Sequence, residues 1–390
     1  GLYMQYILLR KNEPILTFKY LKSGQLQIVE TYDNTLLPLN IQEISNVYLK
    51  DWLSKRCISK SRRNLSKLYD VTGCNSVLEL SFYNHSTNLV DFYWTKKEDE
   101  SITWEDVDFR RNGYSESVGN MLLKNDSSIY VEESPDINTN GITEKAWKRI
   151  NGGDYLFKLG RAPFFQEPYN EIACSKVAQC FPVLNAVSYF LGQVEEKPAS
   201  VCPNFLKENQ EFVPAAHLVP KKHPQDAIYL RLAYICKELG MHNVKEFIDN
   251  MIAFDYVINN TDRHLGNFGF LRDGESGVYL GPAPIFDNGN SLWFDEPTEM
   301  NFHVDNFAKP FCDYQEQQLR LAKHLDNVDF LMLRTIPEII RESLLNVCDT
   351  QRTDKIAFSV QKRIEDLYVY REKLATREKN QHDHSYEEVK

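Results

Sequence analysis

The sequence predicts an α+β protein with two lobes, a small β-rich lobe followed by a mostly helical one, and an added N-terminal α/β module. Short strand-like runs bounded by turn residues lie between residues 134 and 215. From residue 216 onward, apolar residues recur every three or four positions, which indicates helices. With 390 residues the chain exceeds one typical domain, so more than one folded unit is expected.

The composition excludes several classes of protein. A hydrophobic share of 42% and an aromatic share of 12% are enough for a sizeable core. The formal charge of −10 argues against direct binding of nucleic acid, and the basic residues between 50 and 67 are interpreted as a solvated helix face. Charged residues interrupt the apolar N-terminus too early for a signal peptide, and no window is apolar enough to span a membrane. Eight scattered cysteines without a Cys-x-x-Cys pair indicate a reducing, cytoplasmic location.

The N-terminal module is predicted to cover residues 1–133. Strands are expected over 4–20 and 25–31, and helices from Asn40 and over 76–83. Arg56 and Asp91 are compatible with an ion pair, although nothing in the sequence requires one. No catalytic constellation is visible here, so the module is expected to pack on the lobes that follow or to bind a partner.

The β-rich lobe and its hinge are predicted over residues 134–215. Asn151-Gly152-Gly153-Asp154 has the composition of a hairpin turn between strands 146–150 and 155–159. A helix is expected to open at Asn170-Glu171, a strand over 183–191, and a hinge over 200–205.

The helical lobe is predicted over residues 216–376. Its clearest helix, 244–258, leads into the most informative stretch of the chain. A further long helix is expected over 354–375, and the charged residues 377–390 are expected to be disordered.

A short polar loop and a second aspartate point to phosphoryl transfer. Asp262 and Asn267 stand five residues apart, the Asp-x-x-x-x-Asn spacing of kinase catalytic loops. Asp287 follows an apolar strand and precedes Asn-Gly, and a predicted hairpin between the two segments brings their ends together. One carboxylate can orient an attacking hydroxyl, while a carboxylate and an amide oxygen suffice for Mg²⁺ beside phosphates.

The whole cassette, Asp-Arg-His-x-x-Asn, a hairpin, then Ile-Phe-Asp-Asn-Gly, resembles the kinase core of HipA-like proteins, the bacterial toxin-related Ser/Thr kinases. The resemblance covers roughly residues 136–376 and is most specific between 254 and 293. The Asp-Arg-His-x-x-Asn loop is also similar to that of phosphatidylinositol kinases. The resemblance implies a protein-kinase-like fold that binds ATP and Mg²⁺.

The resemblance also implies roles for individual residues. Asp262 would orient or deprotonate the acceptor hydroxyl, with His264 orienting the loop or assisting proton transfer. Asn267 and Asp287 would bind the metal, and Asn288 would support it.

Nucleotide binding would fall mainly to the β-rich lobe. Lys158 would pair with the phosphates and with a helix carboxylate, Glu171 or alternatively Glu167; without the cassette, it would be interpreted as an exposed strand lysine. The phosphate loop would be residues 138–145, with Gly141, Thr143 and Lys145, although Gly141 is its only glycine. Cys202 lies in the predicted hinge, where backbone groups would bind the adenine; the alternative is a buried structural cysteine. Thr139 and Thr143 are the hydroxyls in the phosphate loop that self-phosphorylation would use.

Three functions are compatible with these residues. The first is a Mg-dependent kinase that transfers the ATP γ-phosphate to a Ser/Thr of a protein, itself included. The second is a kinase acting on a small molecule or a lipid. The third is a degenerate nucleotide-binding module that binds a partner. The resemblance implies a protein substrate and a DNA-binding antitoxin as partners, with no membrane association.

Overall fold

The computed structural model describes residues 3–60, 62, 64–115, 118, 136, 145–220 and 227–387. They fall into two compact units, described here separately. Unit 1 consists of residues 1–159, 192–222 and 270–280, and unit 2 of residues 160–191, 223–269 and 281–390. The predicted domain boundaries at residues 133, 215 and 376 stay a prediction.

Unit 1 begins with an antiparallel sheet of strand order β3-β2-β1-β4. Its strands are β1 (Tyr3–Arg10), β2 (Glu13–Leu21), β3 (Leu26–Thr31) and β4 (Tyr93–Lys97). The helices are α1 (Asn46–Lys55), α2 (Leu65–Thr72), α3 (Val77–Tyr83), α4 (Trp104–Val107) and α5 (Phe109–Asn112). The sequence therefore located the first three strands and α3, but it gave no sign that residues 93–97 return to pair with β1.

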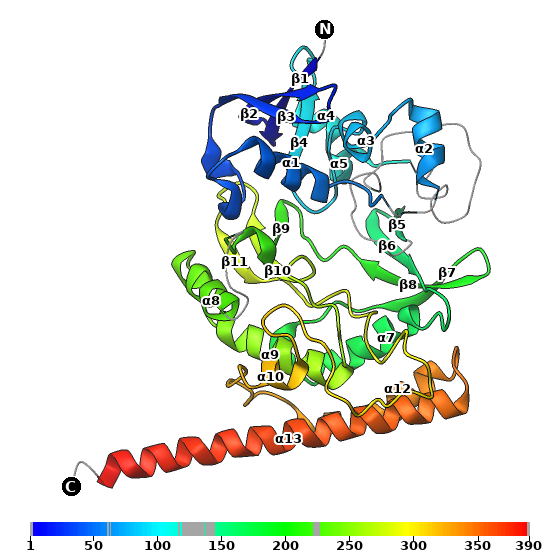
Figure 1. Cartoon of the computed structure of the whole chain (residues 1–390), viewed down its shortest axis with the longest axis vertical. Helices are drawn as coiled ribbons and strands as arrows, with labels where there is room; N and C mark the ends of the chain where they lie inside the picture. The colour runs from blue at the N-terminus through cyan, green and yellow to red at the C-terminus, as the bar shows by residue number, and fades with distance from the viewer. Residues whose placement is uncertain are drawn as a thin grey trace. The chain divides into compact units, whose positions relative to one another are not determined.

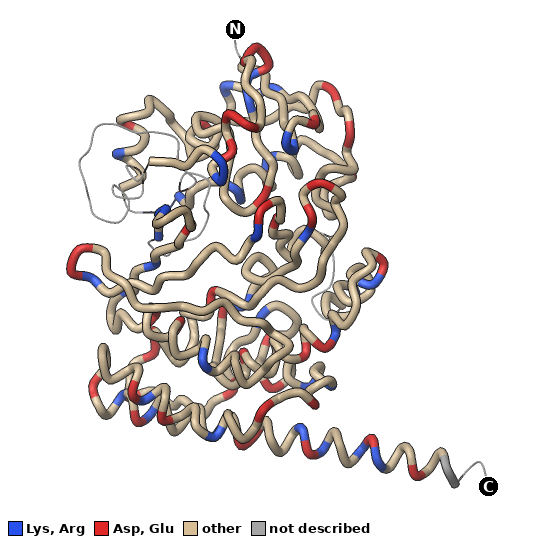
Figure 2. Tube along the Cα trace, turned by 180° about the vertical axis from the view of Figure 1, so that it is seen from behind, with Lys and Arg blue, Asp and Glu red and all other residues tan. Residues whose placement is uncertain are grey.

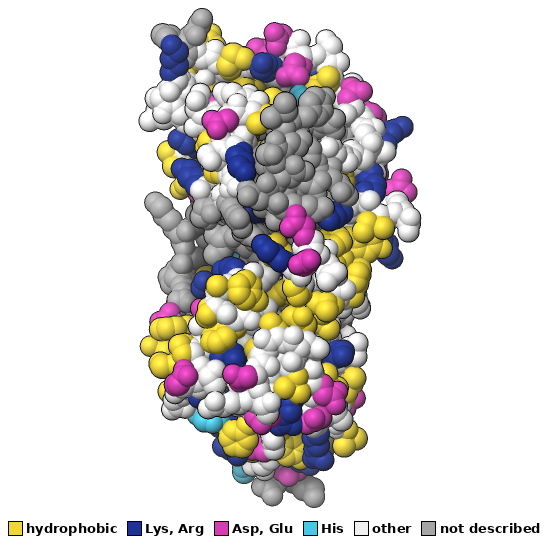
Figure 3. All heavy atoms as spheres, turned by 90° about the vertical axis from the view of Figure 1, so that its right-hand side faces the viewer, with side chains coloured by type: hydrophobic (Ala, Val, Ile, Leu, Met, Phe, Trp, Pro, Cys, Tyr) yellow, Lys and Arg dark blue, Asp and Glu magenta, His cyan; other side chains and the backbone are white. Residues whose placement is uncertain are grey.

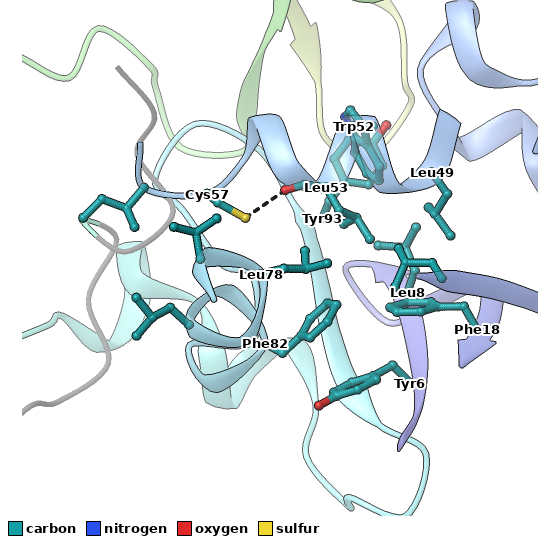
Figure 4. Close-up of a cluster of buried hydrophobic side chains, with 14 of the residues drawn as sticks. Tyr6, Leu8, Phe18, Leu49, Trp52, Leu53, Cys57, Leu78, Phe82 and Tyr93 are labelled. Atoms are coloured by element: carbon teal, nitrogen blue, oxygen red, sulfur yellow. Dashed lines mark hydrogen bonds between the residues drawn. The ribbon is translucent and has the colours of Figure 1, made fainter. Parts of the chain in front are cut away.

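Apolar side chains of this sheet and of α1 and α3 form one core (Figure 4). The ring of Phe82 stacks on that of Tyr6 with centroids 4.5 Å apart, and Trp52 meets Tyr93 edge to face at 5.0 Å. The thiol of Cys57 donates to the carbonyl of Leu53 at 3.1 Å, so this cysteine behaves as a small buried side chain. None of the eight cysteines forms a disulfide.

A buried ion pair ties α1 to the end of this sheet. Arg56 donates to both carboxylate oxygens of Asp91 and also to the carbonyl oxygens of Ser86 and Tyr93. Both charged side chains are at most 10% exposed. The Arg56–Asp91 ion pair, which the sequence was compatible with but did not require, therefore lies in the interior of unit 1.

A second sheet in unit 1 has strand order β5-β6-β8-β7. Its strands are β5 (Lys145–Ile150), β6 (Gly153–Leu159), β7 (Phe190–Val194) and β8 (Lys197–Pro203), and a smaller sheet contains β9 (Gln210–Pro214), β10 (Gly269–Asp273) and β11 (Tyr279–Pro282). Asn151 and Gly152 turn the β5–β6 hairpin with φ values of +50° and +81°, as the sequence predicted. Tyr114 and Arg149 both bond to Asp154, so the N-terminal module packs against this sheet within unit 1.

Unit 2 is built from helices (Figure 1). They are α7 (Glu167–Ala178), α8 (Ile228–Glu238), α9 (Val244–Ile258), α10 (Gln315–Leu319), α11 (Phe330–Leu333), α12 (Ile336–Leu344) and α13 (Thr350–Glu387). Every residue of α9 from Phe247 to Ile258 is buried. Helices α7, α8, α10 and α13 contact α9, and α12 packs against α7 and α13 (Figure 1). This central helix has the bounds that the sequence predicted.

Several predicted elements differ from the structure. The helix expected from Asn40 begins only at Asn46, and Leu39–Ile41 is a 3₁₀ turn. Helix α7 begins at Glu167 rather than at Asn170, because Pro168 starts a helix well in its first turn. Residues 183–191 were expected to form a strand, but Pro182–Leu184 is a 3₁₀ turn and β7 begins only at Phe190.

A further difference concerns residues 377–390, which were predicted to be disordered. Helix α13 continues into them as far as Glu387. Acidic and basic side chains both lie along the last turns of this helix before its grey end (Figure 2).

Charges of both signs lie on one face of the molecule (Figure 3). On the face shown in Figure 3, Lys and Arg side chains are interspersed with Asp and Glu among the described residues. Within the described ranges, no helix combines the length and the apolar character that crossing a bilayer requires.

We expect that Arg56→Leu lowers the free energy of unfolding of unit 1 by about 3–5 kcal/mol, because it leaves the Asp91 carboxylate buried without its partner. Urea unfolding followed by tryptophan fluorescence would measure the loss. The double variant Arg56→Leu/Asp91→Leu should recover most of it. Lys55→Leu, which changes a side chain that is 70% exposed, is the matched control. A loss below 1 kcal/mol for Arg56→Leu would contradict the interpretation.

Candidate active site

The candidate loop is fixed where α9 ends. Asn259 ends the helix in the left-handed region, with φ of +53°. Asn260 then bonds in two directions: its Nδ2 donates to Asp255 Oδ1 at 3.1 Å, and its Oδ1 accepts from the backbone N–H of Asp262 at 3.0 Å. The two asparagines after the helix therefore fix the direction in which the chain enters the loop.

Arg263 is the centre of the loop. It is completely buried, and its guanidinium forms a two-pronged ion pair with Asp255 on α9, at 3.0 Å for each contact. Nη1 also donates to the carbonyl oxygens of Asn267 at 3.2 Å and Phe286 at 2.7 Å, and Nη2 donates to Asn288 Oδ1 at 2.5 Å. All five N–H donors of the arginine are used. These contacts make Arg263 the residue that holds the loop in place.

The charge state of Arg263 follows from the same contacts. Burial alone would lower the pKa of this guanidinium, but the carboxylate of Asp255 raises it above its usual value. Arg263 therefore remains charged, and it connects the two segments that carry Asn267 and Asp287.

The segment around Asp287 returns to the loop through the predicted hairpin. The backbone N–H of Ala283 donates to the carbonyl of Gly269 at 2.8 Å, which closes the ends of the hairpin within unit 2. Asp287 adopts a left-handed conformation with φ of +60°, and its N–H donates to the hydroxyl of Tyr189 at 3.0 Å. A non-glycine residue in this region is uncommon and concentrates at functional sites.

Glu171 supports this segment from α7. Its buried carboxylate accepts the backbone N–H groups of Asn288 at 3.0 Å and Gly289 at 2.9 Å. A Cβ on Gly289 would lie 3.1 Å from Glu171 Oε1, so only glycine allows this close approach comfortably. From the sequence, Glu171 was predicted to form an ion pair with Lys158. Lys158 belongs to unit 1 and Glu171 to unit 2, and their pairing stays a prediction.

Asn267 presents an oxygen suited to a metal ion. Its Nδ2 donates to the carbonyl of Asp262 at 2.7 Å, which fixes the orientation of the amide. Its Oδ1 is buried and accepts no hydrogen bond from any described residue. A buried acceptor without a donor is costly unless a ligand or ion completes it. The residue types therefore fit Mg²⁺, which takes few protein oxygens when phosphates and water supply the rest.

The predicted metal ligands are only two residues. Within the described part of the chain, no three His, Cys, Asp or Glu residues come together as a metal site. Asn267 and Asp287 are one amide and one carboxylate, and Arg263 holds the carbonyls of Asn267 and of Phe286, the residue before Asp287. Asn288 Oδ1 accepts from Arg263 Nη2, and its predicted support of the metal stays a prediction.

Asp262 is held at both carboxylate oxygens. Oδ1 accepts from Lys309 Nζ at 2.9 Å, and Oδ2 accepts from Asn290 Nδ2 at 3.1 Å. Asn290 Oδ1 in turn accepts from Arg161 Nη2 at 2.8 Å, and Arg161 is paired with Glu167. Glu167, the alternative partner for Lys158, thus supports the site from another direction.

Sequence reasoning missed Lys309, Asn290 and Arg161. Asn290 stands three residues after Asp287 and was available as a signal in the Asp-Asn-Gly-Asn run. Lys309 lies 47 residues after Asp262 in a stretch with no regular pattern. No local sequence pattern therefore indicated its contact with Asp262.

His264 orients the loop locally. Its side chain is exposed, and its Nδ1 accepts from the backbone N–H of Gly266 at 3.0 Å. Its own backbone N–H donates to the carbonyl of Asp262 at 2.9 Å. These contacts favour the orienting role of the two considered from the sequence.

The residues assigned to the nucleotide lie in unit 1. Lys145 and Lys158 are direct cross-strand neighbours on β5 and β6, so both side chains stand on one face of the sheet. Lys158 is 7% exposed, which contradicts the alternative of an exposed strand lysine. Cys202 is buried on β8 opposite Leu156. Gly141, Thr143 and Thr139 lie outside the described residues. The nucleotide roles of all these residues stay predictions.

The fold is protein-kinase-like, as the sequence predicted. It has sheets in one part of the chain, helices in the other, and the Asp262–Asn267 loop after a buried helix. The HipA-like C-terminal domain family matches residues 136–350, more than half of the chain. The protein belongs to this family.

Individual relatives are more distant. The chain is 30% identical over 123 residues to the serine/threonine-protein kinase CtkA of Helicobacter pylori, and it spans only 38% of the length of that relative. A chain of the HipA, HipB and operator DNA complex of Shewanella oneidensis MR-1 matches 93% of this chain and 97% of its own length, with a TM-score of 0.56 at 11% identity. The solved CtkA structure covers 59% of this chain and 95% of its own, with a TM-score of 0.46 at 20% identity.

We expect Arg263→Leu to lower the stability of unit 2 by about 3–5 kcal/mol, because the charge of Asp255 stays buried without its partner. Arg263→Lys should recover only part of this loss, since an ammonium has three donors for the five acceptor contacts. Native-state hydrogen exchange of the α9 amides would measure both effects. Arg320→Leu, at an exposed position of unit 2, is the control. Equal protection in Arg263→Leu and the control would contradict the central role of Arg263.

Proposed function

We propose that this protein transfers the γ-phosphate of ATP to a Ser or Thr hydroxyl of a protein, with the chain itself among the acceptors, in a reaction that requires Mg²⁺. The observation that carries the proposal is the buried Oδ1 of Asn267, which lacks a donor among the described residues. It belongs to a loop that Arg263 connects to the Asp287 segment. Asp262, on the same loop, is partly exposed and can reach a substrate.

Each residue of unit 2 has a distinct task in this reaction. Asp262 accepts a hydrogen bond from the acceptor hydroxyl, orients its oxygen toward the γ-phosphorus and takes its proton. Asn290 holds the other oxygen of Asp262, so the carboxylate keeps one orientation. Asn267 Oδ1 and the Asp287 carboxylate would hold Mg²⁺, which when bound neutralises phosphate charge.

Unit 1 would bind the rest of the nucleotide. Lys158 is a buried cation with Lys145 beside it, and such a pair suits polyphosphate. The residues from 138 to 145 would cover the phosphates and the segment around Cys202 the base, as the family resemblance implies.

A protein acceptor is favoured over a lipid or small molecule. The relative from Helicobacter pylori bears the name of a serine/threonine-protein kinase. A lipid kinase would benefit from a polybasic surface, whereas the face in Figure 3 mixes both charges. Incubation with radiolabelled ATP and cell lysate would distinguish labelled protein from labelled lipid or small solutes.

We further propose a basic, DNA-binding partner. The solved relative from Shewanella oneidensis is in a complex with HipB and operator DNA. With a formal charge of −10, this chain would need its partner to supply the phosphate contacts of any DNA complex.

Asp262→Asn should lower the rate of γ-phosphate transfer by ~10²–10⁴-fold, because it removes the proton acceptor. Binding of Mg·ATP should remain, since the asparagine keeps the shape of the side chain. Single-turnover assays with radiolabelled ATP would measure transfer, and thermal shift would measure binding. Asp326→Asn, an exposed aspartate of the same unit, should match wild type. Wild-type turnover in Asp262→Asn would show that the assignment is wrong.

Asn267→Ala and Asp287→Ala should weaken binding of Mg·ATP itself. At a ligand concentration of 100 times Kd, the wild type should gain about 2.7 kcal/mol of stability, and the variants less at the same concentration. EDTA should reduce wild-type binding to the level of the variants. If both variants bind Mg·ATP as tightly as wild type, these residues do not hold the metal.

A further inference from the structure

Lys309 contacts the carboxylate on which the proposed function depends. Its Nζ lies 2.9 Å from Asp262 Oδ1, although 47 residues separate the two in sequence. The remaining N–H bonds of this ammonium have no partner among the described residues. Asp262 and Lys309 side chains are 34% and 52% exposed, so their ion pair adds only about 0–1 kcal/mol to stability. The contact between Lys309 and Asp262 therefore contributes little to the stability of the fold.

The backbone of Lys309 is held more firmly than its side chain. Gln318 donates to the carbonyl of Lys309 at 3.0 Å and accepts the N–H of Phe311 at 3.0 Å. Gln315 donates to the carbonyls of Phe307 at 3.1 Å and of Asn260 at 3.2 Å. Both glutamines are 4% exposed. The loop that carries Lys309 is thus anchored directly to the start of the loop that carries Asp262.

We propose that Lys309 is a further catalytic residue, whose ammonium contacts Asp262 and stabilises the phosphoryl group as it is transferred. This inference rests on the proposed function. A carboxylate can accept about four hydrogen bonds, so Lys309 and Asn290 leave room for the acceptor hydroxyl. The two N–H bonds of Nζ that do not contact Asp262 are then available to phosphoryl oxygens beside the acceptor.

The transfer balances with Lys309 protonated throughout. The acceptor oxygen forms a bond to the γ-phosphorus, the bond from that phosphorus to the β–γ bridging oxygen breaks, and ADP leaves with the electron pair. The acceptor proton passes to Asp262. Negative charge on the transferring group lies next to a fixed cation, and such preorganised donors act most strongly on the transition state.

Two variants test this role. Lys309→Met removes the charge and keeps the apolar stem, and Lys309→Arg keeps the charge. Lys323→Met, at an exposed lysine of unit 2, is the control. Transfer is measured as total γ-phosphate lost from Mg·ATP in single turnover, with dephosphorylated casein as added acceptor. Thermal shift compares the affinity for Mg·ATP with that for Mg·ADP with aluminium fluoride, which mimics the transferring phosphoryl group.

Lys309→Met should transfer ~10²–10³-fold more slowly than wild type, as expected for loss of one charge-stabilising donor. It should bind Mg·ATP like wild type but bind the aluminium fluoride complex more weakly by a similar factor. Lys309→Arg should recover most of the rate. Turnover of Lys309→Met within threefold of wild type, or equal weakening of both ligands, would overturn the role of Lys309.

The two proposals fail in different ways. If wild type and Asp262→Asn are equally inactive and neither binds Mg·ATP, the proposed kinase function is wrong and the inference falls with it. If wild type is active, Asp262→Asn is inactive and Lys309→Met equals wild type, only the role of Lys309 is wrong.

Discussion

The ion pair between Arg263 and Asp255 is the interaction on which the candidate site depends. Asp255 lies on the most buried helix of unit 2, and Arg263 uses every N–H it has. A charge buried to this degree is tolerated only when it is fully paired and hydrogen-bonded. Arg263 therefore needs the acceptors that the loop and the Asp287 segment provide. These two segments are in turn held in position by their hydrogen bonds to Arg263.

The residues available for chemistry lie around this rigid centre. Glu171 fixes the backbone after Asp287 from α7, and Asn290 and Lys309 fix the Asp262 carboxylate from two other segments. The oxygen of Asn267 remains buried without a donor among the described residues. A buried acceptor of this kind fits an oxygen ligand for Mg²⁺, and the metal-binding role of Asn267 stays a prediction.

Membership of the HipA-like family agrees with this arrangement but does not specify it. The family model matches residues 136–350. The N-terminal residues, which contained no catalytic pattern, contact the second sheet of unit 1. Tyr114 donates to Asp154, and the carbonyl of Phe109 accepts from Arg149.

The sequence by itself determined α9, the β5–β6 hairpin, the loop from Asp262 to Asn267 and the segment ending at Asp287. Local periodicity, turn residues or short spacing indicates each of them. Only the tertiary structure decided what surrounds them. The return of β4 to β1, the contacts of Glu171 with the backbone after Asp287, and Lys309 on Asp262 join residues far apart in the chain. No local pattern encodes such contacts, because they depend on how complete elements pack and on which buried groups then need partners.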